Sequence, residues 1–179
     1  RRQLATSVSV VDAQQIRDYG SFTLTDILRQ TAAVGASSNG GVGSLSTLRI
    51  RGEQGFRTLT VFDGMRLSDP SGTQVAAPIE HLLASEIGRI EVLRGPQGTL
   101  YGRNATGGAI NVISAKPVLG EFGAKGSASY GNYDAKRGLA TLNLPLGDTA
   151  AIRLTGLRSK RDGLQENTGL GLDFAQQNH

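Results

Sequence analysis

The chain has 179 residues, a formal net charge of +4, a pI of about 9.8 and a mean hydropathy of −0.20. This length holds one ordinary domain, or a small domain and part of another. The lack of cysteine excludes a disulfide framework and a thiolate metal site. No apolar run is long enough for a transmembrane helix, and no apolar segment follows the basic start to make a signal peptide.

The first three elements are predicted by β-branched residues and by helix caps. Thr6–Val11 is a β-branched run and is expected to be a strand. Asp12 and Gln15 have the spacing of a capping box, which predicts a helix immediately after Asp12. A second helix is expected over Leu24–Ala33, with Thr23 as its N-cap.

The middle of the chain combines a polar loop, two short strands and a third helix. Gly35–Ser46 is rich in glycine and serine and is expected to be a flexible loop. Strands are predicted over Thr47–Gly52 and Thr58–Phe62, and the turn pair Asp63-Gly64 closes the second of them. A third helix is expected to begin at Pro78, with an apolar face formed by Ile79, Leu82, Leu83 and Ile87.

Two more strands are predicted on either side of a glycine-rich segment. Arg89–Leu93 and Ala109–Ser114 both alternate apolar and polar residues. The glycines between them allow tight turns and close backbone contacts. With the preceding elements, these strands predict an α+β unit over about residues 1–118, built from a small mixed sheet and short helices.

The pattern changes after Pro117, where helical periodicity ends and longer alternating segments begin. Three antiparallel strands are expected, with one apolar face formed by Phe122, Ala124, Gly126, Ala128, Tyr130, Leu142, Leu144, Leu146, Ile152 and Leu154. Such segments are typical of transmembrane β-barrel strands, but also of an antiparallel sheet with one solvated face, and periodicity alone does not separate the two. Three strands cannot close a barrel, which needs about eight, so we expect the barrel to be incomplete.

Catalytic chemistry is not indicated. The two histidines are His81, on the expected third helix, and His179, the last residue, while Asp63 is explained as a turn residue. No metalloprotease, serine-hydrolase or phosphate-loop motif occurs. The basic residues are scattered apart from Arg158–Arg161, where no aromatic residues are interleaved to stack on bases. We therefore expect no enzyme, no cofactor, no bound metal and no nucleic-acid partner.

The segment Arg89–Pro117 contains the blocks IEVLRGP, LYG and GGAINVI in this order. It resembles the plug-domain signature of TonB-dependent outer-membrane receptors, as do LRIRG at Leu48–Gly52, TLTVFDG at Thr58–Gly64 and the helix sequence TLTDILRQTAAV. The resemblance implies a plug domain over residues 1–118 and, over 119–179, the first three strands of a truncated β-barrel. The plug portion is expected to fold marginally when expressed alone, whereas the barrel strands, with open edges and a lipid-facing apolar band, are not expected to fold alone. Export of such a protein implies a processed or truncated N-terminus.

The resemblance also implies a role in transport. The plug would gate a barrel lumen in the outer membrane of a Gram-negative bacterium, surrounded by lipid, for active uptake of a scarce solute, most often a ferric siderophore or a similar iron complex. Haem, cobalamin, nickel chelates and oligosaccharides are other ligands of the family. The partner TonB, with ExbB and ExbD, would act on a TonB box that lies before Arg1 and is missing from this sequence. The alternative is a soluble ligand-binding or adhesion module with an antiparallel sheet, which a complete protein that needs no detergent would favour.

The resemblance places site residues in two groups. Three loops, Ser37–Leu45, Glu53–Phe56 and Ser68–Gln74, would face the extracellular side and contribute the ligand-binding residues Ser37, Ser38, Asn39, Gly40, Gln54, Phe56, Ser71 and Gln74. In the motifs IRG and LRG, Arg51 and Arg94 would reach glutamates of the barrel wall, because a guanidinium matches a carboxylate with two hydrogen bonds. Without that wall, we expect both arginines to be unpaired, or paired within the plug with groups such as Glu91.

Overall fold

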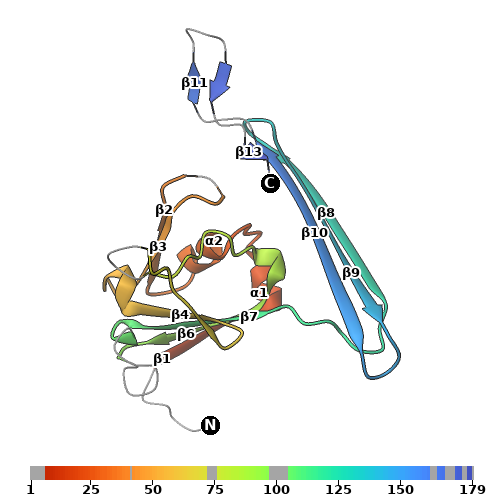
Figure 1. Ribbon diagram of the computed structural model, residues 1–179, viewed down its shortest axis with the longest axis horizontal. Helices are drawn as coiled ribbons and strands as arrows, with labels where there is room; N and C mark the ends of the chain where they lie inside the picture. The colour runs from red at the N-terminus through yellow and green to blue at the C-terminus, as the bar shows by residue number, and fades with distance from the viewer. Residues whose placement is uncertain are drawn as a thin grey trace. The chain divides into compact units, whose positions relative to one another are not determined.

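The computed structural model describes residues 7–40, 42–71, 76–96, 105–161, 165–167, 172–174 and 177–178. The chain divides into two compact units, Arg1–Ala115 and Lys116–His179 (Figure 1). The first contains helices and a mixed sheet, and the second contains strands. The fold predicted from the sequence, an α+β unit followed by antiparallel strands, is confirmed.

The first unit is built on a mixed sheet with the strand order β1-β6-β7-β4-β5. Its strands are β1 (Ser7–Asp12), β4 (Thr58–Phe62), β5 (Met65–Leu67), β6 (Ile87–Arg94) and β7 (Gly108–Ser114). The β4–β7 pair is parallel, whereas the other three pairs are antiparallel. Strand β1 pairs with β6, and β6 pairs with β7, so the sheet joins the N-terminal strand to the two strands that carry the IEVLRGP and GGAINVI blocks.

Two short helices begin at the caps that the sequence predicts. Helix α1 (Ala13–Asp18) begins after Asp12, which forms a capping box with Gln15. Helix α2 (Leu24–Arg29) begins after Thr23, whose side chain accepts a hydrogen bond from the backbone of Asp26. Helix α2 is shorter than expected because the chain turns through Ala33, at a φ of 64°, into the next strand.

The core lies between α2 and the sheet. Leu24, Ile27 and Leu28 of α2 are fully buried, as are the inward residues of the strands and one loop residue, Ile50, Ile79, Ile90, Val92, Ile110 and Val112. Burial of each such side chain stabilises the fold by roughly 1.5–3 kcal/mol. The alternation predicted for Arg89–Leu93 and Ala109–Ser114 is thus confirmed, since the expected apolar face is the one that packs on α2.

The prediction of a flexible loop over Gly35–Ser46 is wrong. This region contains β2 (Val34–Ser38), which pairs antiparallel with β3 (Ser46–Ile50) to form a hairpin. Val34 is buried and Ala36 packs against the core, so small residues on alternate positions are enough to fix the strand. One pair of hydroxyl groups also bonds across the hairpin, Ser37 with Thr47 at 2.7 Å.

The prediction of a third helix from Pro78 is also wrong. The chain there forms turns, the short 3-10 helix η2 (Ala84–Glu86) and the start of β6 at Ile87. The backbone N–H of Leu24 donates to Leu82 O at 2.8 Å, and the N–H of Ala84 donates to Phe22 O at 2.9 Å. Because the Leu82 carbonyl and the Ala84 N–H bond to the first residue of α2 and to Phe22 just before it, they are not available for a helix of their own. Ile79 is buried nonetheless.

Asp63 closes the β4–β5 hairpin and also anchors β7. It lies at a φ of 45°, followed by Gly64 at 85°, as a tight primed turn requires. Its Oδ1 accepts a hydrogen bond from the N–H of Ser114 at 2.9 Å, and its own N–H donates to Val112 O at 2.9 Å. The turn residue therefore ties the end of β7 to the neighbouring hairpin.

We expect Asp63→Ala to destabilise the first unit by about 1–2 kcal/mol, because the Ser114 N–H loses its acceptor and alanine tolerates a positive φ less well. Asp63→Asn should cost much less, since the amide keeps an acceptor oxygen and suits this backbone conformation. Urea unfolding of the two variants measures the difference. Equal losses would mean that the negative charge, and not the acceptor, stabilises the turn.

The second unit is an antiparallel sheet with the order β13-β10-β9-β8. Its strands are β8 (Gly123–Gly131), β9 (Ala135–Pro145), β10 (Ala151–Arg161) and β13 (Gln177–Asn178), and a separate pair is formed by β11 (Gln165–Asn167) and β12 (Leu172–Phe174). Leu142 of β9 lies opposite Ala124 and Leu154, so the expected apolar residues share one face. The larger ones, among them Phe122, Tyr130, Leu142 and Leu154, are exposed.

Candidate functional site: the plug loops and the motif arginines

The tip of the β2–β3 hairpin carries four of the residues predicted to bind ligand. Ser37 and Ser38 end β2, while Asn39 and Gly40 are exposed in the turn that follows. The N–H of Asn39 donates to Leu45 O at 3.1 Å, and the Ser38 hydroxyl donates to Gly40 O at 3.3 Å. The tip is thus an ordered polar hairpin end that presents an amide side chain and backbone groups to solvent.

The second predicted loop forms the 3-10 helix η1 (Gly55–Arg57). Gln54 precedes it and is exposed, and Phe56 lies under the Arg57 guanidinium, 5.7 Å from ring centroid to Cζ. Arg57 also forms an ion pair with Glu53 at 3.2 Å. Gly55 allows η1 to approach β3, because a Cβ there would lie 2.9 Å from Leu48 O. Phe56 therefore presents a half-buried ring whose charged neighbour is already paired.

The third predicted loop is closed by its own hydrogen bonds. The N–H of Asp69 donates to Ala76 O at 2.9 Å, and Asp69 Oδ1 accepts from the Ser71 hydroxyl and N–H. These two hydrogen bonds from Ser71 lower the pKa of Asp69 below its ordinary value. Ser71 is therefore exposed but engaged within the turn. Gln74 lies outside the described residues.

Arg51 occupies an unusual backbone position. It has a φ of 53°, which a non-glycine residue adopts at a cost of about 1–2 kcal/mol, and Gly52 follows at 80°. Its exposed side chain has no hydrogen-bond or ion-pair partner within the described part of the chain, and its Nη1 lies 3.9 Å from the position that a Cβ on Gly95 would take. The two motifs IRG and LRG, far apart in the sequence, thus meet at this point.

Arg94, the other motif arginine, is held by the first strand. Its Nη1 donates to the Ser7 hydroxyl at 3.0 Å, and its Nη2 donates to the Ser9 hydroxyl. Its Nε is buried and has no partner among the described residues. Sequence reasoning missed Ser7 and Ser9, although the alternation Ser-Val-Ser-Val places both on one face of β1. Arg94 therefore connects the edge strand β1 to the LRG motif, and its Nε–H donor is unpaired among the described residues.

Glu91 does not pair with Arg94. Its carboxylate forms an ion pair with Arg89 at 2.6 Å and accepts a hydrogen bond from Asn111 at 3.2 Å. We expected Arg94 to be unpaired or to pair within the plug with groups such as Glu91. It pairs within the plug, but its partners are the hydroxyl groups of Ser7 and Ser9. A barrel-wall role for Arg51, Arg94 and Glu91 stays a prediction.

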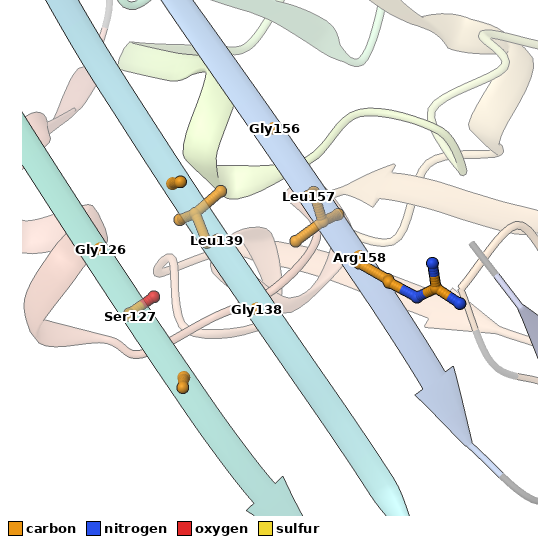
Figure 2. Close-up of a pocket in the computed structure, with 9 residues that line it drawn as sticks. Gly126, Ser127, Gly138, Leu139, Gly156, Leu157 and Arg158 are labelled. Atoms are coloured by element: carbon orange, nitrogen blue, oxygen red, sulfur yellow. The ribbon is translucent and has the colours of Figure 1, made fainter.

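A shallow hollow lies on the second unit and involves none of the predicted ligand residues. It is lined by glycine, alanine, serine, leucine and arginine residues of β8, β9 and β10, which include Gly126, Gly138, Gly156, Leu139, Leu157 and Arg158 (Figure 2). Across the described ranges, no group of three or more acidic or histidine side chains is placed to hold a metal ion, and no helix is long and apolar enough to cross a membrane.

A family model for the TonB-dependent receptor plug domain matches residues 1–109. The chain belongs to the TonB-dependent receptors. This family consists of transport receptors and not enzymes, and its members lie in the outer membrane of Gram-negative bacteria with the plug inside the barrel. The sequence predictions of family, non-enzymatic character and localisation are confirmed.

Solved structures of such receptors resemble the chain over both units. The ferric-catecholate import receptor Fiu of E. coli K12 in its open form is 30% identical, covers 92% of this chain and superposes with a TM-score of 0.69. The ferric yersiniabactin uptake receptor FyuA of Yersinia pestis is 25% identical, covers 96% of this chain and superposes with a TM-score of 0.71. The alcaligin outer-membrane receptor FauA of Bordetella pertussis is 27% identical, covers 90% of this chain and superposes with a TM-score of 0.72. The chain spans 23%, 27% and 27% of these three proteins, about a quarter of each receptor.

The edge strand β1 provides the described hydrogen-bond partners of the motif arginine Arg94. Among the described strands of this TonB-dependent receptor chain, β1 pairs with β6 alone and buries Val11, while Val8 and Val10 are exposed. Ser7, the first described residue, lies opposite Arg94. The polar contacts of Arg94 are therefore located at the N-terminal end of the strand, next to the preceding segment.

Proposed function

We propose that this chain is the plug, residues 1–118, and the first barrel strands, 119–179, of a receptor that takes up a ferric siderophore or a similar iron complex in a TonB-dependent manner. The proposal rests chiefly on the agreement of both units with the ferric-catecholate import receptor Fiu, the ferric yersiniabactin uptake receptor FyuA and the alcaligin receptor FauA. The exposed polar groups of the hairpin tip offer hydrogen bonds, and the half-buried Phe56 ring offers an apolar contact; both kinds of group suit a chelated iron complex.

Gating would begin at β1 in this proposal. TonB, energised through ExbB and ExbD, would pull on a segment before residue 1, and among the described contacts the load would reach those of Ser7 and Ser9 with Arg94 first. Because β1 has one neighbouring strand and one buried apolar side chain, its detachment costs less than that of a central strand. The loss of the serine contacts would leave Arg94 without its partners in the plug.

Replacement of the hairpin tip tests ligand binding. Exchange of residues 39–45 for a two-residue Gly-Gly turn should remove the Asn39 amide and the rest of the tip but keep the Ser38–Ser46 pair and the core below it, because Gly-Gly suits a tight hairpin. In the complete receptor, we expect at least about tenfold weaker binding of the cognate ferric siderophore, identified from a panel of catecholate, hydroxamate and carboxylate complexes by fluorescence quenching. Outer-membrane insertion should be unchanged.

A matched control is the exchange of Asp148 for asparagine in the β9–β10 connection, outside the predicted ligand surface. It should bind as the parent does. Uptake of labelled iron by cells that lack TonB should stop in both proteins, which separates transport from binding. Unchanged affinity of the tip variant would contradict the assignment of the hairpin tip at Asn39 and Gly40, and binding of none of the iron complexes would contradict the proposed solute.

A further inference from the structure

The apolar face of the second unit ends in a group of basic and aromatic side chains. On β10 the alternation that exposes Leu154 brings Arg158 and Lys160 to the same face. Lys136 of β9 lies opposite Lys160, and Tyr130 of β8 lies opposite Lys136. We call Lys136, Arg158 and Lys160 the basic cluster.

Among the residues that the structure describes, the basic cluster carries more positive charge than its neighbours neutralise. Lys136 Nζ lies 2.9 Å from Asp134 Oδ1 and 5.8 Å from the centroid of the Tyr130 ring. The hydrogen bond from Lys136 lowers the pKa of Asp134, helped by Tyr130 and the charge of Lys160, so this carboxylate is ionised. It offsets one of three positive charges. Arg158 is exposed and has no hydrogen-bond or ion-pair partner within the described ranges (Figure 2).

The position of the cluster along the strands matches a membrane interface. Phe122 and Tyr130, both exposed, lie on the same face near opposite ends of β8. At about 3.4 Å per residue, they are separated by about 27 Å along the strand, or roughly 20 Å across a membrane at the usual tilt. Aromatic and basic side chains collect at both edges of the apolar band of outer-membrane barrels, which is about 25 Å tall.

The lengths of the connections show which edge this is. At the end of the sheet that holds the cluster, residues 132–134 connect β8 to β9, and residues 162–176, the longest of the three stretches, separate β10 from β13, which pairs with it at Lys160 and Arg161. At the other end, residues 146–150 connect β9 to β10. Barrels of this kind have short periplasmic turns and longer extracellular loops. The cluster therefore lies at the extracellular end, beside the outer leaflet of the membrane.

We propose that the basic cluster binds the phosphate groups of the phosphorylated glycolipid of the outer leaflet, with the acyl chains of that lipid against the apolar face. Arg158 suits a phosphate with two parallel hydrogen bonds, and the two lysines contribute point charges beside it. The Tyr130 ring lies at the boundary between headgroup and acyl chains, where such rings are favoured. This contact concerns the lipid and is independent of the imported solute and of TonB.

The test uses the complete receptor, stripped of lipid in detergent, and titrates it with bisphosphorylated lipid A in native mass spectrometry. The variant Arg158→Gln with Lys160→Gln should bind about tenfold more weakly, since each basic residue near an anionic surface contributes several-fold to affinity. Each single variant should lose about threefold. The parent should also bind monophosphoryl lipid A more weakly, and the double variant should not distinguish the two lipids.

The control variant removes the same charge from the opposite face. Lys125→Gln with Arg153→Gln should keep the parent affinity, because these residues alternate with the apolar ones. Arg158→Lys with Lys160→Arg should also keep it within about threefold. Equal loss in the control variant, parent-like binding by the double variant, equal binding of phosphatidylcholine, or displacement of lipid A by millimolar inorganic phosphate would each overturn the proposal.

Discussion

Gly108→Ala is expected to prevent the plug from folding stably, with a loss of about 3–5 kcal/mol. Gly108 starts β7 at a φ of 144°, and a Cβ there would lie 2.4 Å from Leu93 O and 2.9 Å from Ile50 Cδ1. The first clash involves the backbone of the paired strand β6, which cannot move away without breaking the sheet. Urea unfolding of a polypeptide that covers residues 1–118 measures the loss.

Two other glycines separate backbone strain from steric conflict. Gly35→Ala should change stability by no more than about 0.5 kcal/mol, because its Cβ would meet Arg49 O at an ordinary 3.8 Å and its φ is not positive. Gly64→Ala has open space but a φ of 85°, so a loss of about 1–2 kcal/mol is expected. If Gly108→Ala were no worse than Gly64→Ala, the close approach of β6 and β7 would not be the cause.

Replacement of both motif arginines is expected to release the plug from the barrel wall. We propose that Arg51 and Arg94 pair with wall glutamates in the complete receptor, because Arg51 is exposed without a partner among the described residues and the described contacts of Arg94 are to neutral serine hydroxyls. Arg51→Ala with Arg94→Ala would leave buried carboxylates unmatched, at a cost of about 3–5 kcal/mol. Hydrogen exchange and protease protection of the plug in outer-membrane preparations should fall markedly.

Arg49→Ala is the matched control, since Arg49 points to the exposed face of β3 and stands outside both motifs. It should leave plug protection unchanged. Arg51→Lys with Arg94→Lys should restore part of the protection, because an ammonium keeps the charge but not the paired hydrogen bonds. Full plug protection in the double alanine variant would refute the pairing of these arginines with the barrel wall. Full protection in the double lysine variant would mean that positive charge alone, without the paired hydrogen bonds, holds the plug.

Local sequence signals predicted the parts of the fold that depend on neighbouring residues. Asp12 and Thr23 cap their helices because a cap is formed with residues two or three positions away. Asp63 and Gly64 form the expected turn for the same reason. The faces of β6, β7 and β8–β10 follow from an alternation of period two, which is independent of the partner strand.

Contacts between distant residues decided the rest. Pro78–Ile87 has helical spacing of its apolar residues, but its backbone bonds to Phe22 and Leu24, a partner that local spacing does not reveal. Gly35–Ser38 becomes a strand because β3 is available to pair with it. The serines on β1 hold Arg94 because β1 lies beside β6, more than eighty residues later in the chain.

The sequence by itself determined the family, the two kinds of unit and the motif glycines and arginines, because these depend on residue identity at short spacings. Only the tertiary structure decided that Arg51 approaches Gly95, that Arg94 binds Ser7 and Ser9, and that Lys136 and Lys160 meet at one end of an apolar face. The physical reason is that register and strand order set these neighbours. Both arise from the packing of the whole unit, where many weak contacts select one arrangement.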